Sequence, residues 1–224
     1  MISLVLPVHR QADHIGAIVA EYVKALARVP APCELLLVAN GRDDGSRAEC
    51  RSAAERFPQV RALVREEGGW GGAVLHGLAE ARGELLGYTN SARTSPDDLV
   101  LFLLYALAYP GIVIKANRKI RESAARRAGS LLYNLECRSL FDLPTWDVNG
   151  TPKLFPRSFG ALLSLSEPGD LVDAEFVAIC RREGYPILEV PLISTRRHGG
   201  RSTTSLRSAL RMYWGAYRLK RRRA

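Results

Sequence analysis

The stretches ISLVLPV at residues 2–8 and ELLLVA at residues 34–39 decide the fold of this 224-residue chain. Both are short apolar runs rich in branched side chains, and an Asn-Gly pair follows the second, which predicts two buried β-strands. Residues 13–27 between them repeat apolar side chains at helical spacing, and Asp13 is expected to cap that helix. A strand, a helix and a further strand in this order indicate the parallel pairing of an α/β protein.

The same alternation continues along the rest of the chain. Further strands are expected at 60–64, 84–89, 111–116, 153–155 and 187–191, and helices at 46–57, 73–81 and 128–140, with another opening at Ser95-Pro96. This order predicts a mostly parallel sheet with helices on both faces. Ligands of such sheets bind beyond the carboxyl ends of the strands. The loops at 7–11, 39–45 and 90–94 are therefore expected to form the site.

Composition and charge narrow the class of protein. The length suits one domain, and a hydrophobic fraction of 47% with 25% charged residues is ordinary for a soluble globular protein. Ten of the 32 basic residues lie within residues 196–224, which contain no acid, so the net charge of +9 belongs to the C-terminal arm and the body is not expected to bind nucleic acid. Four scattered cysteines predict neither a disulfide framework nor a zinc site, and no run approaches the ~20 apolar residues of a membrane span. A cytoplasmic protein is expected.

Seven segments carry a recognisable order of motifs: LVLPVHRQADHI at 4–15, VANGRDDGS at 38–46, GGWGGAVLHGL at 68–78, GYTNSARTSPDDL at 87–99, DVNGTPKLFPR at 147–157, DAEFVAICRREGYPILEVPL at 173–192 and RRHGGRS at 196–202. Taken in order, these segments resemble glycosyltransferase family 2, and especially its polyprenyl-phosphate branch, which is dolichol-phosphate-mannose-synthase-like. The resemblance implies a GT-A fold, a three-layer α/β/α sandwich, over residues 1–204. Residues 205–224 would follow it as a basic amphipathic helix.

The resemblance also implies a donor site for a UDP- or GDP-linked sugar at the strand ends. Its implied residues are Pro7, His9, Arg10, Asn40, Gly69, Trp70, Gly71, Asn90 and Ser91. Asn40 could equally stabilise the turn with Gly41. The glycines before the third helix would let the backbone approach a phosphate.

The metal position departs from the resembled family. Where the family has Asp-x-Asp, this chain has Thr89, Asn90 and Ser91, and hard cations need charged oxygens. We therefore expect no metal cofactor, with Mg²⁺ or Mn²⁺ if there is one. Arg93 is predicted to stabilise the leaving diphosphate in place of the metal, unless it is simply a solvated loop residue. Asp97 and Asp98 are better explained as an ordinary helix start than as substitute ligands.

On the acceptor side, a basic stretch follows the strand at 111–116. Arginine suits phosphate, and by resemblance the phosphate-binding residues are Arg118, Arg121, Arg126, Lys153, His198 and Arg201. An ionised phosphate acceptor needs no strong base. A hydroxyl acceptor would need one, and Asp173 or Glu175 is the candidate. Asp147 is expected beside the transferred sugar, or otherwise to cap the turn at 149–150.

The C-terminal arm spaces apolar and aromatic side chains at helical intervals among basic ones. Such a helix binds anionic membrane surfaces, or it packs on its own domain or on the second subunit of a homodimer. The sequence thus predicts an inverting enzyme that moves a sugar from a nucleotide donor to a lipid-linked phosphate at the inner face of the membrane. The alternatives are transfer to a soluble hydroxyl acceptor and a non-catalytic descendant that binds a nucleotide or a partner protein.

Overall fold

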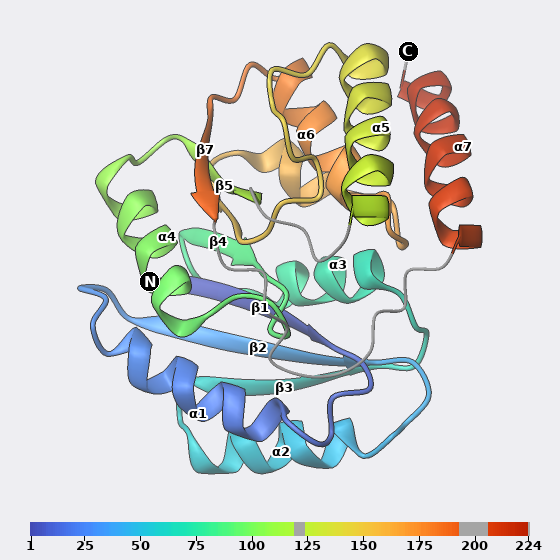
Figure 1. The fold of residues 1–224 in the computed structure, drawn as a ribbon. Helices are drawn as coiled ribbons and strands as arrows, with labels where there is room; N and C mark the ends of the chain where they lie inside the picture. Colours follow the sequence, from blue (N-terminus) through green and yellow to red (C-terminus); the bar gives the residue numbers. More distant parts are fainter. Residues whose placement is uncertain (119–123, 193–205, 224) are drawn as a thin grey trace.

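The computed structural model of the chain describes the backbone of residues 1–118, 124–192 and 206–223, and the side chains of 1–118, 128–192 and 212–221. Its elements alternate along the chain (Figure 1). They are β1 (Ile2–Val8), α1 (Ile15–Leu26), β2 (Cys33–Asn40), α2 (Ser46–Arg56), β3 (Val60–Arg65), α3 (Trp70–Glu80), β4 (Leu85–Tyr88), α4 (Pro96–Ala108), β5 (Val113–Arg118), α5 (Ala124–Phe141), β6 (Lys153–Pro156), a 3-10 turn (Gly160–Ser164), α6 (Val172–Arg182), β7 (Ile187–Leu192) and α7 (Leu206–Arg223).

The seven strands form one sheet in the order β3-β2-β1-β4-β6-β5-β7. All neighbours pair in parallel except β6, which runs antiparallel to both β4 and β5. The predicted mostly parallel sheet is confirmed. Because β1, β2, β4 and β5 point the same way, the loops that follow them meet along one edge.

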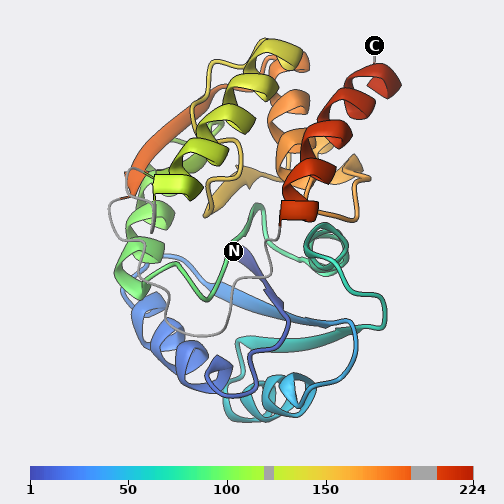
Figure 2. The ribbon, with the colours of Figure 1, turned by 45° about the vertical axis from the view of Figure 1, so that its right-hand side comes forward.

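The strands are apolar on both faces because helices cover both. In β1, Leu4 and Leu6 pack with α1 and α4, whereas Val5 between them packs with α3 and α6. Figures 1 and 2 show the sheet between these helix layers, with α5 and α7 side by side in the second layer. The predicted three-layer GT-A sandwich is confirmed.

Two helix starts test the capping expectations. The Ser95 hydroxyl accepts a hydrogen bond from the Asp98 amide at 3.1 Å and donates to the Asp98 carboxylate at 2.6 Å, so the ordinary helix start is confirmed. The expectation for Asp13 is wrong, because α1 begins only at Ile15 with His14 as its cap residue. The Asp13 carboxylate accepts instead from His14 Nδ1 at 2.5 Å.

Over the described ranges, the chain has no helix whose length and hydropathy together would carry it across a bilayer. The four cysteines are all unpaired thiols, as the sequence indicates.

Candidate active site

Asn40, at the carboxyl end of β2, joins three of the loops at the site edge. Its side-chain amide donates to the Val8 carbonyl at 3.0 Å, and its Oδ1 accepts from the Gly69 amide at 3.1 Å. The imidazole of His9 lies 2.9 Å from the Asn40 carbonyl through Nδ1. Asn40 therefore fixes the ends of β1 and β2 and the start of α3 relative to one another. This arrangement favours the turn-stabilising role that the sequence left open.

The loop after β4 uses its own polar groups internally. The hydroxyls of Thr89 and Thr94 are 2.7 Å apart, and Ser91 donates to the Gln11 side chain at 2.8 Å. Asn90 accepts from the Ala92 amide through Oδ1 at 3.0 Å. These residues build a closed turn over the segment compared above with an Asp-x-Asp motif. Arg93 is half-buried on the same turn.

The glycine-rich start of α3 packs closely against the loop before α6. The Gly72 amide donates to the Pro168 carbonyl at 2.7 Å. A Cβ on Gly71 would lie 2.2 Å from the Glu167 carbonyl oxygen and 2.5 Å from that of Gly169, so only glycine fits there. This packing is a reason for the glycines in addition to the predicted approach to a phosphate. Trp70 places its ring edge-on to Tyr88, with 6.2 Å between centroids.

Asp173, at the start of α6, differs from the other predicted acids in how its two carboxylate oxygens are bonded. Its Oδ1 accepts from the Tyr88 hydroxyl at 2.8 Å and from the Lys153 ammonium, so two donors converge on one oxygen. The other oxygen, Oδ2, forms no hydrogen bond within the described part of the chain. Lys153 itself is 0% exposed, and burial lowers the pKa of its ammonium to about 8, against the opposing pull of the Asp173 carboxylate.

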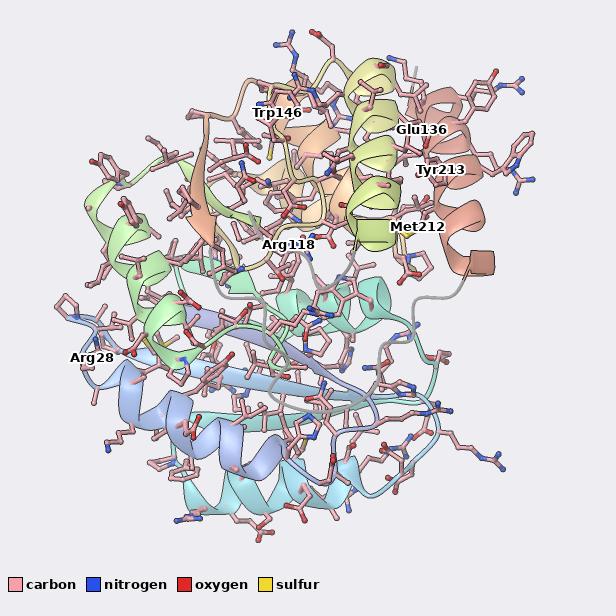
Figure 3. The ribbon with its side chains drawn as sticks, viewed as in Figure 1. Arg28, Arg118, Glu136, Trp146, Met212 and Tyr213 are labelled. Carbon is pink, nitrogen blue, oxygen red and sulfur yellow. The ribbon has the colours of Figure 1, made fainter. Side chains whose placement is uncertain are left out.

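A second ion pair closes the end of β5. Arg118 grips both carboxylate oxygens of Asp147, at 2.7 Å and 2.8 Å, and its backbone amide adds a third bond at 2.9 Å. Figure 3 shows Arg118 in the middle of the molecule. Burial opposes the charge of Arg118, but the Asp147 carboxylate outweighs it and raises the pKa of the guanidinium. The predicted phosphate ligand and the predicted sugar-side acid thus bind each other here.

Lys115 and Glu189 hold the loop that carries Asp147. The buried Lys115 ammonium donates to the Asp147 carbonyl and to Glu189, both at 2.6 Å. Glu189 also accepts from the backbone amides of Trp146 and Asp147. Neither Lys115 nor Glu189 was predicted as part of the site. The signal available was a charged residue inside an apolar strand, as in VIKAN and ILEVPL.

Glu175 has a different environment from Asp173. It is fully buried, and its carboxylate accepts from the Ser166 amide and hydroxyl and from the Glu167 amide, all within 2.9 Å. These bonds fix the loop that packs on α3. Glu175 is therefore a loop anchor in this structure, and its assignment as the catalytic base does not fit its contacts.

The remaining predicted site residues differ in exposure, and four of them lie outside the described side chains. Pro7 is buried within β1, and Arg10 is exposed in the loop after it, with a left-handed backbone at φ 54°. Lys153 has no exposed surface, so its assignment to the acceptor phosphate does not fit its position. The side chains of Arg121, Arg126, His198 and Arg201 lie outside the described residues.

Comparison with known proteins gives the class of this chain. Residues 3–158 match the model of the family described as Glycosyl transferase family 2. That match covers more than half of the chain, and the fold is the GT-A sandwich. The chain therefore belongs to glycosyl transferase family 2, and its class is that of the glycosyltransferases.

Solved structures give more particular likenesses. Glucosyl-3-phosphoglycerate synthase from Mycobacterium tuberculosis, in complex with Mn²⁺, uridine diphosphate and glucosyl-3-phosphoglycerate, has a TM-score of 0.75 and 20% identity over 98% of this chain and 79% of that one. The same enzyme with Mg²⁺ and uridine diphosphate has a TM-score of 0.75 and 19% identity over the same shares. Mannosyl-3-phosphoglycerate synthase from Rubrobacter xylanophilus has a TM-score of 0.72 and 22% identity over 100% of this chain and 73% of that one. At these identities the likeness shows the fold. No match was found among curated protein sequences.

The comparisons contradict the expectation that no metal cofactor is used, because the two structures from Mycobacterium tuberculosis hold Mn²⁺ or Mg²⁺ together with uridine diphosphate. That expectation rested on the missing protein carboxylates, but Mg²⁺ keeps several waters and binds largely through substrate phosphates. Arg93 as a substitute for the metal falls with that expectation. Within the described residues no group of three or more His, Cys, Asp or Glu side chains could hold a metal ion. These side chains do not fit a metal site preformed by the protein alone.

Proposed function

We propose that this chain transfers a sugar, with inversion, from a nucleotide-sugar donor to a hydroxyl group of a small phosphate-bearing acceptor. Asp173 is the general base in this proposal. The observation that carries it is the asymmetric carboxylate of Asp173, with one oxygen fixed by Tyr88 and Lys153 and the other unbonded. A base must be held in place and must keep one lone pair for the proton that it removes.

The alternatives among the acids support this choice. The three bonds from Ser166 and Glu167 occupy Glu175, and Arg118 occupies both oxygens of Asp147. The Lys153 ammonium forms an ion pair with Asp173 and so holds the carboxylate in place. Asp147 then serves by orienting Arg118 toward an anion.

The donor is expected at the edge where β1, β2 and β4 end. Asn40 fixes three of the loops there, and ligands of open α/β sheets bind beyond such strand ends. The similar structures hold uridine diphosphate with Mn²⁺ or Mg²⁺. We propose that a divalent cation enters this site with the donor diphosphate. Arg93 remains a proposed donor-side residue on the turn after β4.

The similar synthases and the basic segment after β5 support a phosphate-bearing acceptor. The structures from Mycobacterium tuberculosis include complexes with phosphoglyceric acid and with glycerol 3-phosphate. In this chain the segment from Arg118 to Arg127 contains five basic residues, and arginine binds phosphate through paired donors. An acceptor of this kind presents a neutral hydroxyl, which requires the base that Asp173 supplies.

A lipid-linked phosphate is the second candidate acceptor, and α7 is the feature that favours it. Seven of its 18 residues are basic and none is acidic, which suits an anionic membrane surface. With this acceptor the phosphate itself attacks, and Asp173 has no proton to remove. The two candidates therefore differ in their need for the base.

The test is a product screen by mass spectrometry. The purified chain is incubated with UDP- and GDP-linked hexoses and Mg²⁺ or Mn²⁺, with 3-phosphoglycerate, glycerol 3-phosphate or a short-chain polyprenyl phosphate as acceptor. The proposal predicts a glycosylated small phosphate that is lost in Asp173→Asn. A glycosylated polyprenyl phosphate formed equally by Asp173→Asn would establish the second candidate. Nucleotide binding without any product would establish the non-catalytic alternative.

A further inference from the structure

The outer face of the α5–α7 layer is exposed and apolar. On α5, Leu132 is 60% exposed and Leu135 is 62% exposed, and on α7, Trp214 is 68% exposed and Tyr217 is 50% exposed. Large side chains at these exposures need an explanation when they gather on adjoining elements. The two helices lie side by side in Figures 1 and 2.

Helical spacing places these four side chains on the same side of the layer. Tyr133 of α5 faces Tyr213 of α7, with their rings edge to face at 5.7 Å, and Cys137 points into the core. At 100° per residue, Leu132 and Leu135 point away from the Cys137 side of α5. The inner side of α7 is set by Ala216 and Leu219, both buried in the core.

The same spacing on α7 places Trp214 and Tyr217 opposite Leu219. Figure 3 shows Glu136 and Tyr213 where the two helices meet. Leu132, Leu135, Trp214 and Tyr217 thus form one apolar surface, the α5–α7 face.

The charge of the two helices identifies what this face fits. Together α5 and α7 carry ten Lys and Arg residues and one acid, Glu136. Glu136 is partly buried, and its Oε2 is enclosed and unbonded. Among the basic residues, Arg218 and Arg221 of α7 are exposed beside the aromatic pair. An exposed apolar and aromatic surface with arginines beside it, on two helices rich in basic residues, is the pattern of an amphipathic surface that lies on an anionic bilayer.

We propose that the α5–α7 face is a docking surface for an anionic lipid bilayer. The aromatic and leucine side chains enter the headgroup boundary, and the basic side chains bind acidic headgroups. A second copy of the chain is disfavoured as the occupant, because two such basic faces repel each other. This proposal is independent of which acceptor the enzyme uses.

The experiment measures partition of the full-length chain to sedimented vesicles of 30% phosphatidylserine in phosphatidylcholine, and to pure phosphatidylcholine. Binding is expected to the anionic vesicles and to weaken steeply with salt. In Trp214→Ala the partition coefficient should fall about tenfold, because a large apolar side chain is no longer buried. The double variant Arg218→Gln with Arg221→Gln should lower it about 25-fold, or about fivefold for each basic residue.

The matched control is Leu104→Ser, which changes a leucine of 41% exposure on α4 in the other helix layer. It should leave partition unchanged, and circular dichroism should show all variants folded. Equal binding to neutral vesicles, or equal loss in Leu104→Ser, would overturn the proposal. A wild-type chain that stays in the supernatant with anionic vesicles would also overturn it. So would size-exclusion chromatography that shows a dimer formed through this face in a chain that does not bind the vesicles.

Discussion

At the scale of single residues, Lys153 makes the stability of the protein depend on pH. Its buried ammonium donates to Asp173, and burial lowers the pKa of Lys153 from 10.5 to about 8. The unfolded chain then holds the proton between about pH 8 and 10.5, where the folded chain has released it. Since stability rises with pH wherever the unfolded state binds more protons, the lysine's penalty is present below pH 8 and relieved above it.

We therefore expect the free energy of unfolding of the wild type, relative to Lys153→Met, to increase across pH 8 to 10.5. Urea unfolding at half-unit pH intervals measures this difference. A difference that stays flat or falls over that window would contradict the lowered pKa. Turnover should fall above pH 8 in the wild type, because Asp173 then loses its charged partner.

Replacing Asn40 should affect both stability and nucleotide binding. In Asn40→Ala the Val8 carbonyl and the Gly69 amide lose their side-chain partner, which costs about 1–3 kcal/mol for groups that become buried without one. Affinity for the donor nucleotide should fall as well, because three site loops are no longer tied. Calorimetric unfolding and nucleotide titration measure the two effects. Arg42→Ala, an exposed change two residues further on, is the control and should alter neither.

Sequence reasoning reached part of this site. It selected Asp147, Asp173 and Arg118 by their place in a resembled pattern, but it could not pair Arg118 with Asp147. The two are 29 residues apart, and the antiparallel strand β6 and its preceding loop bring them together. Lys153 was assigned to a phosphate by resemblance, and only the packing around β6 shows that it is buried with Asp173.

At the scale of helices and strands, the sequence predicted a helix start correctly where the capping side chain bonds to backbone groups close to it in the chain. The start of α4 was predictable because Ser95, Pro96 and Asp98 meet every local requirement of a helix N-terminus. The start of α3 was not predictable. Gly71 and Gly72 lie inside the helix, where Gly71 packs against the loop that contains Pro168 and the Gly72 amide donates to the Pro168 carbonyl. No local propensity reports that contact.

The cap of α4 supplies the element-scale prediction. Ser95→Ala removes the acceptor of the Asp98 amide and should cost about 1 kcal/mol of stability. For a chain of this size that corresponds to a fall of about 2–4 °C in Tm, measured by differential scanning calorimetry. Ser52→Ala, an exposed serine inside α2, should leave Tm unchanged or slightly higher. An unchanged Tm in Ser95→Ala would show that the cap is not stabilising.

At the scale of the whole molecule, the two-sided apolar strands and their alternation with helices were sufficient to predict the three-layer GT-A sandwich. The antiparallel direction of β6 followed from no pattern in the chain, since its four residues read like any short buried strand. In this pairing Lys153 of β6 lies opposite Tyr88 of β4, and both side chains donate to Asp173 of α6. The expectation that no metal cofactor is used was also wrong, because the residues of one loop do not indicate which cation accompanies a bound diphosphate.

The role of Asp173 as the base is measured by the steady-state rate of Asp173→Asn with a nucleotide sugar and the phosphate-bearing acceptor. The variant keeps an oxygen for Tyr88 and Lys153 but cannot take a proton. We expect kcat to fall by about 10²–10⁴-fold, with KM for the donor little changed. The control Asp97→Asn, at an exposed ion pair with Arg28, should retain full turnover. Undiminished kcat in a folded Asp173→Asn protein would contradict the assignment of Asp173 as the base.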